Sequence, residues 1–302
     1  MSDEINIVDR ENAKEMTEKV YGQWFLSLLY NSFSGKILAP FFTNKIFSKI
    51  YGSLQDLPLS QSKYESFIKN FDIKMEEYIL DHPDEKVPFK TFNDFFIRQF
   101  KENARPFPKQ DEEFPAFSEG RYLIYNEIND KVVFPIKGHY LGVQQILENK
   151  ELAEKFEGGP LIVSRLCPVD YHRFHFPDHG KIVQSYRTSG KLNSVNPIAL
   201  KHNPKLYLEN ERHITIMETN NFGTLAYIEV GAICVGKIIQ NYKGNDFNKG
   251  QEKGYFLFGG STVLLFAQKG KLSLDQDILD NTKNHKETFI KLGSRIGQSS
   301  TV

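Results

Sequence analysis

From about residue 110 onward, the sequence is a succession of short β-branched or aromatic runs, each bounded by Gly, Asn, Asp or Pro. Runs such as PLIVSRL, GKIVQSYRT and HITIMETN are typical of strands separated by tight turns. Only GVQQILENKELAEKF interrupts them with the apolar spacing of a helix. The pattern predicts a β-rich domain with mostly antiparallel strands.

The first hundred residues have a different pattern. From about residue 12 to residue 100, apolar side chains recur at helical spacing, as in EKVYGQWFLSLLY. These faces either pack in a core, which is the commoner case, or lie on a bilayer, and the sequence leaves both open. The segment RPFPKQDEEFP, with three prolines and a charge cluster, is typical of a linker.

We therefore expect an α+β protein with two regions. Residues 1–108 form a helical, membrane-facing region, and residues 109–302 form the β-rich domain. The glycine-flanked segments VFPIKGH and NDFNKGQEKGYF resemble turns of lipoyl-type barrel sandwiches, so we expect barrel-sandwich-like elements by analogy of fold alone.

Charge and cysteine content exclude several classes of protein. Lys and Arg number 38, as do Asp and Glu, so the chain lacks the basic excess that is typical of a nucleic-acid binder. Two cysteines, Cys167 and Cys234, indicate neither a disulfide framework nor a metal site. The N-terminus is polar, and the apolar segment at residues 20–42 contains polar side chains, so we expect an intracellular protein without a membrane-spanning helix.

Two motifs resemble ligand-binding sites, but their residues do not support binding of phosphate or of a metal ion. GAICVGKI nearly matches a phosphate-binding loop, but Ile238 replaces the hydroxyl that would bind Mg²⁺ and no helix pattern follows. CPVDYHRFHFPDH contains His172, His175 and His179, but no set of Cys, Asp or Glu completes a tetrahedral metal site. Acid–base chemistry is the stronger interpretation of these histidines, because histidine titrates near neutral pH.

The apolar run FLFGGSTVLLF contains two glycines and two hydroxyls. A serine with a histidine base elsewhere is the material for a nucleophile, and Gly260 has no Cβ to block approach to its own carbonyl. Attack by the Ser261 hydroxyl on that carbonyl would replace the peptide bond by an ester, and β-elimination would then cut the chain. The residues alone leave this as one alternative among several.

Several long segments occur together in the order of one known family. The chain resembles the phosphatidylserine decarboxylases, of the type cleaved at G-G-S-T, over about residues 90–270, and more loosely in its N-terminal part. The segments that carry the resemblance are TFNDFFIRQFKENARP, CPVDYHRFHFP, SVNPIAL, NERH, VGAICVGKI and KGQEKGYFLFGGSTVLLF.

The resemblance implies self-cleavage between Gly260 and Ser261, which gives a large chain of residues 1–260 and a small chain of residues 261–302. Ser261 would become a covalent pyruvoyl group, so neither pyridoxal phosphate nor a metal ion is needed. His175 matches the base for the serine hydroxyl, and His172 matches the histidine linked to decarboxylation and protonation. The pyruvoyl carbonyl then acts as an electron sink while phosphatidylserine loses CO₂ and becomes phosphatidylethanolamine.

One departure concerns the aspartate of the family's triad, found in a stretch like P-A-D-G. This chain has FPAFSEG, which places Phe117 at that position if aligned from the left and Glu119 if aligned from the right. Glu119 is our candidate, with Asp170 as a substitute. A misplacement of about 1 Å costs on the order of 10²-fold in rate, so processing with Glu119, slow processing and no processing all stay open.

Three functions compete at this stage. The first, which we predict, is a peripheral membrane enzyme on the cytoplasmic face that acts on phosphatidylserine, with no nucleic-acid partner and with a homodimer suggested by the family. The second is a family member without self-processing that binds lipid or a partner. The third is a pyruvoyl decarboxylase of a soluble amino acid, which the aromatic N-terminal helices disfavour.

Overall fold

The structure is a computed structural model. Part of the N-terminal apolar segment, the VFPIKGH segment, Cys234 and Gly260 lie outside the residues that it describes. The described residues are 5–19, 21–22, 45–82, 88–128, 142–202, 205–232, 237–259 and 261–300.

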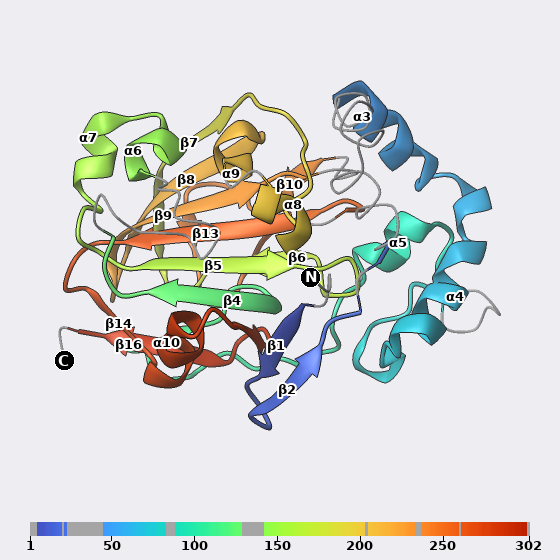
Figure 1. The fold of residues 1–302 in the computed structure, drawn as a ribbon, viewed down its shortest axis with the longest axis horizontal. Helices are drawn as coiled ribbons and strands as arrows, with labels where there is room; N and C mark the ends of the chain where they lie inside the picture. The colour runs from blue at the N-terminus through green and yellow to red at the C-terminus, as the bar shows by residue number, and fades with distance from the viewer. Residues whose placement is uncertain are drawn as a thin grey trace.

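A ten-stranded sheet dominates the molecule (Figure 1). All of its neighbouring strands are antiparallel except β1 and β15, which run parallel. In spatial order, the strands are β11 (Asp246–Phe247), β7 (Gly180–Thr188), β8 (Arg212–Thr219), β9 (Gly223–Val230), β13 (Ser261–Ala267), β5 (Leu161–Leu166), β4 (Gly120–Tyr125), β15 (Glu287–Ile290), β1 (Asn6–Asp9) and β2 (Lys14–Thr17).

Two three-stranded sheets complete the β structure. The first has the order β10 (Ile238–Gln240), β12 (Glu252–Phe256) and β6 (Arg173–His175). The second has the order β14 (Leu272–Leu274), β16 (Arg295–Ser299) and β3 (Glu113–Pro115). The α+β class with mostly antiparallel strands is therefore confirmed.

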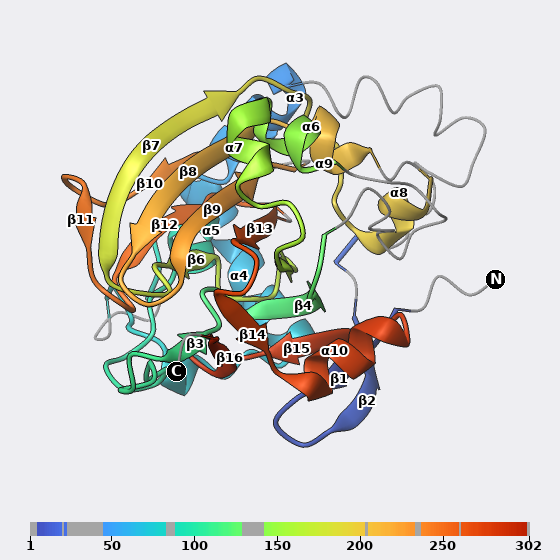
Figure 2. The same ribbon diagram turned by 90° about the vertical axis from the view of Figure 1, so that its left-hand side faces the viewer.

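Helices lie around the sheets rather than between them. In Figure 1, α3, α4 and α5 stand together beside one end of the strands, and Figure 2 shows α6, α7 and α9 along one edge of the curved sheet. The α-helices are α3 (Lys45–Leu54), α4 (Ser62–Phe71), α5 (Phe92–Phe96), α6 (Val143–Leu147), α7 (Lys150–Glu154), α8 (Pro197–His202), α9 (Leu206–Glu209) and α10 (Gln276–Lys283), with 3₁₀ turns at Pro58–Ser60 and Met75–Glu77.

The N-terminal region is not wholly helical. Strands β1 and β2 form a hairpin, and β1 joins the ten-stranded sheet beside β15. The expectation of a helix from about residue 12 is therefore wrong for β2. Its four residues are all exposed and carry no apolar periodicity, so no local pattern indicates a strand there. The division of the chain at residue 108 stays a prediction.

Strand β13 is the structural centre of the candidate site. Each of its seven residues is buried, and it is paired on one side with β9 and on the other with β5. The strand begins at Ser261, so this serine stands at the end of a strand that is held along both edges. Gly259, two residues earlier, has φ = 143°, a conformation that side chains other than glycine rarely adopt.

An aromatic cluster covers this end of the sheet. It joins α4 and α5 to the residue that precedes the two glycines, Phe258, whose amide donates a 3.0 Å hydrogen bond to Asn93 Oδ1 in α5. A capping box between Thr91 and Asp94 fixes the start of that short helix. The buried members of the cluster are Tyr64, Phe67, Phe89, Phe92, Phe95, Phe96 and Phe258.

Candidate active site

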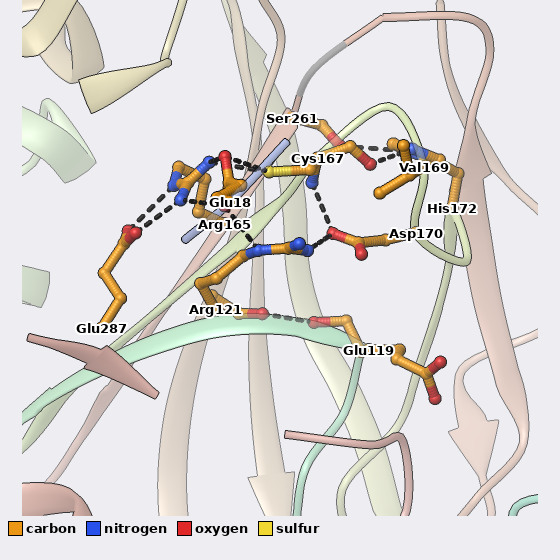
Figure 3. Close-up of polar contacts among 12 residues, drawn as sticks. Glu18, Glu119, Arg121, Arg165, Cys167, Val169, Asp170, His172, Ser261 and Glu287 are labelled. Carbon is orange, nitrogen blue, oxygen red and sulfur yellow. Dashed lines mark hydrogen bonds and ion pairs between the residues drawn. The ribbon is translucent and has the colours of Figure 1, made fainter. Parts of the chain in front are cut away.

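Ser261 and His172 form the central contact of the site (Figure 3). Both side chains are completely buried, and Ser261 Oγ lies 3.5 Å from His172 Nδ1. His172 is held just before β6, and its backbone carbonyl accepts a 2.9 Å hydrogen bond from the amide of Phe256 in β12. The sheet that contains β6 and β12 therefore brings the histidine to the first residue of β13.

The other nitrogen of the His172 ring fixes its tautomer. His172 Nε2 lies 2.8 Å from the backbone carbonyl oxygen of Cys167. A carbonyl only accepts hydrogen bonds, so Nε2 carries the hydrogen and Nδ1 presents its lone pair to the Ser261 hydroxyl. This is the arrangement that a general base requires.

The surroundings of His172 keep the ring neutral. Burial, with a smaller contribution from the Arg98 guanidinium, lowers the pKa of His172 to about 3. Phe96 stacks on the imidazole with ring centroids 3.9 Å apart, and Phe258 lies against Phe96 with its ring nearly perpendicular. The aromatic cluster thus removes water from the base.

A closed loop from Cys167 to Asp170 sets the carbonyl that orients His172. The Asp170 amide donates to the Cys167 carbonyl at 2.9 Å, and the Cys167 amide donates to Asp170 Oδ2 at 2.6 Å. Arg98 donates to the carbonyls of Val169 and Asp170 at 3.0 and 3.2 Å, and Arg121 forms an ion pair with the Asp170 carboxylate. Burial raises the pKa of Asp170 to about 6, and Arg121 opposes that rise.

His175 has a different environment from His172. Its Nδ1 lies 2.9 Å from the carbonyl oxygen of Gly250, and its Nε2 lies 3.4 Å from the Tyr171 hydroxyl. Over the described ranges, no hydrogen bond joins His175 to Ser261. Residues three apart in an extended segment point to opposite faces, which explains why only one of the two histidines meets the serine.

Glu119 forms a buried ion pair rather than a triad. Its carboxylate binds Arg105 at 2.6 Å and accepts a 3.2 Å hydrogen bond from the Leu292 amide, while Arg105 also binds Glu77 at 2.8 Å. Within the part of the chain that the structure describes, Glu119 makes no polar contact with either histidine. Figure 3 shows its carboxylate pointing away from the group around Ser261.

Phe117, the other candidate for the triad position, is a core residue. Its ring packs 5.2 Å from that of Tyr227, and its carbonyl accepts a 2.8 Å hydrogen bond from the His175 amide. The FSEG stretch therefore lies beside the histidine motif but brings no carboxylate to Ser261.

Comparisons with known proteins show which family the sequence resembles. A family model described as phosphatidylserine decarboxylase matches residues 92–298. A phosphatidylserine decarboxylase proenzyme of Clostridium novyi (strain NT) is 41% identical over 295 residues, which cover 97% of this chain and 99% of the relative. Proenzymes of Clostridium tetani (strain Massachusetts / E88) and Clostridium perfringens (strain SM101 / Type A) are each 40% identical, over 97% of this chain and 98% and 99% of the relatives.

The chain belongs to the phosphatidylserine decarboxylase family. The clostridial decarboxylase proenzymes match almost the whole chain, whereas the family model begins at Phe92. The N-terminal region, where the resemblance in sequence motifs is loose, is therefore shared with these relatives.

The sequence named Asp170 only as a substitute triad carboxylate, whereas the structure places it against the Cys167 amide and Arg121. The roles of Arg98, Arg121 and Glu18 in supporting His172 were not predicted. Arg98 and Asp170 lie inside motifs that carried the resemblance, but those motifs do not say that Arg98 grips the Val169 and Asp170 carbonyls. Glu18 and Arg121 lie outside the motifs, and only the folded structure brings them to Asp170. One sequence signal was present: Arg121 is a charged residue within the apolar strand pattern GRYLIY, and a buried charge indicates a charged partner.

Proposed function

We propose that this chain is a phosphatidylserine decarboxylase proenzyme that cuts itself before Ser261 and then converts phosphatidylserine to phosphatidylethanolamine and CO₂. The observation that carries the proposal is the 3.5 Å contact between Ser261 Oγ and the unprotonated Nδ1 of a neutral His172. The printed names of the clostridial relatives support both the substrate and the proenzyme state.

Self-cleavage follows from this contact. His172 Nδ1 takes the proton of the Ser261 hydroxyl as its oxygen attacks the preceding carbonyl carbon. The peptide C–N bond breaks, the nitrogen takes up the proton from Nδ1, and an ester joins the two segments. Loss of the Ser261 Cα proton and rupture of the Cβ–O bond leave a carboxylate on Gly260 and dehydroalanine at residue 261. Tautomerisation and hydrolysis then release ammonia and leave the pyruvoyl group.

This assignment differs from the roles implied by the family motif. We propose His172 as the base in self-cleavage, in place of His175, because His172 is the histidine within reach of Ser261. We propose that Glu119 holds Arg105 instead of completing a triad. The Cys167 carbonyl, which orients the ring, takes the place of the triad carboxylate.

The surroundings of residue 261 fit a pyruvoyl group. The group is made from the serine itself, so it occupies the buried end of β13 beside His172 and the aromatic cluster. The pyruvoyl carbonyl supplies an electron sink for the loss of CO₂ from an amino acid. His172 Nδ1 then faces the same position and can hold or deliver a proton there, while Phe96 and Phe258 exclude water.

A lipid surface is the substrate source that the N-terminal region favours. Ile50 is 60% exposed and Leu59 is 88% exposed, and Leu54 and Leu57 are also exposed on the same stretch. Large apolar side chains that are exposed so close together in the sequence favour an interaction surface. No helix in the described ranges is long and apolar enough to cross a membrane. We propose peripheral binding through this stretch, and the cytoplasmic face and a homodimer rest on the family resemblance alone.

Intact mass and denaturing electrophoresis test the proposal. We expect the purified protein to give two fragments, residues 1–260 and residues 261–302, with the smaller one blocked by a pyruvoyl group. S261A and H172A should stay whole, and H175A should still be cut. Cleavage of H172A together with an intact H175A chain would contradict the assignment of the base.

Substrate assays separate the alternatives. We expect decarboxylation of phosphatidylserine in vesicles. A chain that stays whole and only binds vesicles would indicate a lipid-binding family member without self-processing. Equal activity on free serine would indicate a decarboxylase of soluble amino acids.

A further inference from the structure

Arg121 lies at the centre of a buried ionic cluster beside the site (Figure 3). It belongs to β4, next to the strand that leads into the Cys167–Asp170 loop. Its Nη1 is paired with the Asp170 carboxylate, and its Nε lies 2.7 Å from Glu18 Oε2. The side chains of all three residues are at most 8% exposed, so these pairs are shielded from water.

A short series of contacts connects Arg121 with Ser261. Asp170 Oδ2, held by Arg121, accepts the Cys167 amide at 2.6 Å. The carbonyl of that same Cys167 residue accepts His172 Nε2 at 2.8 Å, and His172 Nδ1 faces Ser261 Oγ. Movement of the Asp170 carboxylate therefore moves Cys167, whose carbonyl sets both the ring orientation and the tautomer of His172.

We propose that Arg121 is a positioning residue for self-cleavage, which holds the Asp170 carboxylate and through it the Cys167 carbonyl behind His172. Glu18, directly after β2 in the N-terminal hairpin, holds Arg121 from the other side. The inference rests on the proposed self-cleavage at Ser261. It makes the N-terminal hairpin part of the processing machinery, although that hairpin lies far from the histidine and G-G-S-T motifs in the sequence.

The remainder of the cluster shows that Arg121 differs from its neighbour Arg165. Arg165 binds Glu18 at 2.9 Å and Glu287 at 2.8 Å, and its Nη1 lies 2.8 Å from the Cys167 thiol. No contact in the described part of the chain joins Arg165 or Glu287 to the Asp170 carboxylate. Glu287 is thus a matched control, because it belongs to the same buried cluster on the side away from Asp170.

The charges around Asp170 give the proposal a signature in pH. A protonated Asp170 loses its charge-assisted grip on Arg121 and on the Cys167 amide, so cleavage should weaken as pH falls through the pKa of Asp170, about 6. Protonation of His172 comes at lower pH, because its pKa is about 3. The titratable and charged groups around Asp170 are Arg121 from β4, Glu18 from the N-terminal hairpin, Cys167 and Arg165 from the β5 side, Arg98 after α5, and His172 of its own segment.

The test follows cleavage of the full chain after brief cell-free synthesis, in buffers from about pH 5 to pH 8. R121Q should cleave about 10- to 100-fold more slowly, as expected for a misplaced base. The acid limb of the pH–rate profile is the range in which cleavage slows as pH falls. In R121Q this limb should move up by about one pH unit, because the cation that stabilises the Asp170 carboxylate is gone. R121K keeps the charge but cannot reach both acids, so it should slow cleavage without the upward shift.

Two glutamate variants complete the comparison. E18Q removes a negative neighbour of Asp170, so its acid limb should move down, opposite to that of R121Q. E287Q should lower the melting temperature when it is measured in an S261A background. In the chain that retains Ser261, E287Q should leave the acid limb of cleavage in place. Rates that follow only the melting temperature, with no shift in any acid limb, would overturn the positioning role. A wild-type chain that stays whole would contradict the proposed function itself, and the inference would fall with it.

Discussion

The ring of Phe96 stacks on the imidazole of His172, with planes only 21° apart. Phe96 belongs to α5 in the N-terminal region, and His172 belongs to the β-rich part of the chain. The candidate site is therefore built across the predicted division at residue 108, and neither part alone provides both the base and its apolar cover.

We expect F96A to raise the pKa of His172 from about 3 toward its ordinary value near 6.5, because water reaches the ring. The variant should also lose about 3–5 kcal/mol of unfolding free energy, as is usual for a buried Phe replaced by Ala. NMR titration and denaturant unfolding in an S261A background measure the two effects. F96L, which retains most of the volume, is the control; an unchanged His172 titration in F96A would contradict the shielding role.

Glu119 gives a prediction that separates stability from chemistry. E119Q leaves the buried Arg105 with Glu77 as its charged partner, so the unfolding free energy should fall by about 3 kcal/mol. Self-cleavage should continue, because Glu119 does not touch His172. E77Q, at the more exposed partner of Arg105, should cost less. Loss of cleavage in a folded E119Q protein would contradict this assignment and would indicate that Glu119 acts in the catalytic triad.

A second buried pair lies in the core near β9 and β12. Lys253 Nζ lies 2.6 Å from Glu229 Oε1, and both side chains are fully buried. Breaking the pair with E229Q should cost about 3–5 kcal/mol, because the Lys253 charge stays behind without its counter-ion. The double variant E229L/K253M should recover much of that loss in urea unfolding. If the double variant is as unstable as the sum of the single variants, the pair contributes more than mutual neutralisation.

Stability should fall with acid because two histidines are buried in the neutral form. Burial, as the largest cause, lowers the pKa of both His172 and His213 to about 3, compared with 6.5 for an ordinary histidine. The unfolded chain therefore takes up protons first, and the stability present above pH 6.5 is lost as pH falls toward 3.

Each of these histidines contributes a slope of up to about 1.4 kcal/mol per pH unit in that window. Asp170 has the opposite effect on stability. Its pKa is raised to about 6 in the folded protein, so the folded state takes up this proton at higher pH than the unfolded chain does. H213Q in an S261A background should give a shallower dependence of the unfolding free energy on pH than S261A alone. Parallel curves for the two proteins would contradict the buried neutral state of His213.

The β-rich part of the fold was predictable because its strands are short apolar runs between turn residues, and β5 and β13 are buried throughout. Strand β2 was not, because its residues KEMT are exposed on all sides and its strand form depends on pairing with β1. That pairing is a tertiary preference, which no local pattern contains.

The site shows the same limit. Ser261 and His172 were both candidates, and the structure brings them together. The choice between His172 and His175 as base depends on which face of an extended segment meets β13, and the motif carries no such information. The support from Arg121 and Glu18 depends on ion pairs between strands that are remote in sequence, so only the three-dimensional structure shows it.

The central place of β13 determines what a cut at its first residue would produce. The segment that follows contributes β13 between β9 and β5, β15 between β4 and β1, and β16 beside β3. A protein cleaved before Ser261 would thus become a heterodimer in which both subunits contribute strands to the ten-stranded sheet and to the β14–β16–β3 sheet. Such subunits could not dissociate without global unfolding. Once unfolded, the two pieces would have to find each other in solution, so refolding would become a bimolecular process.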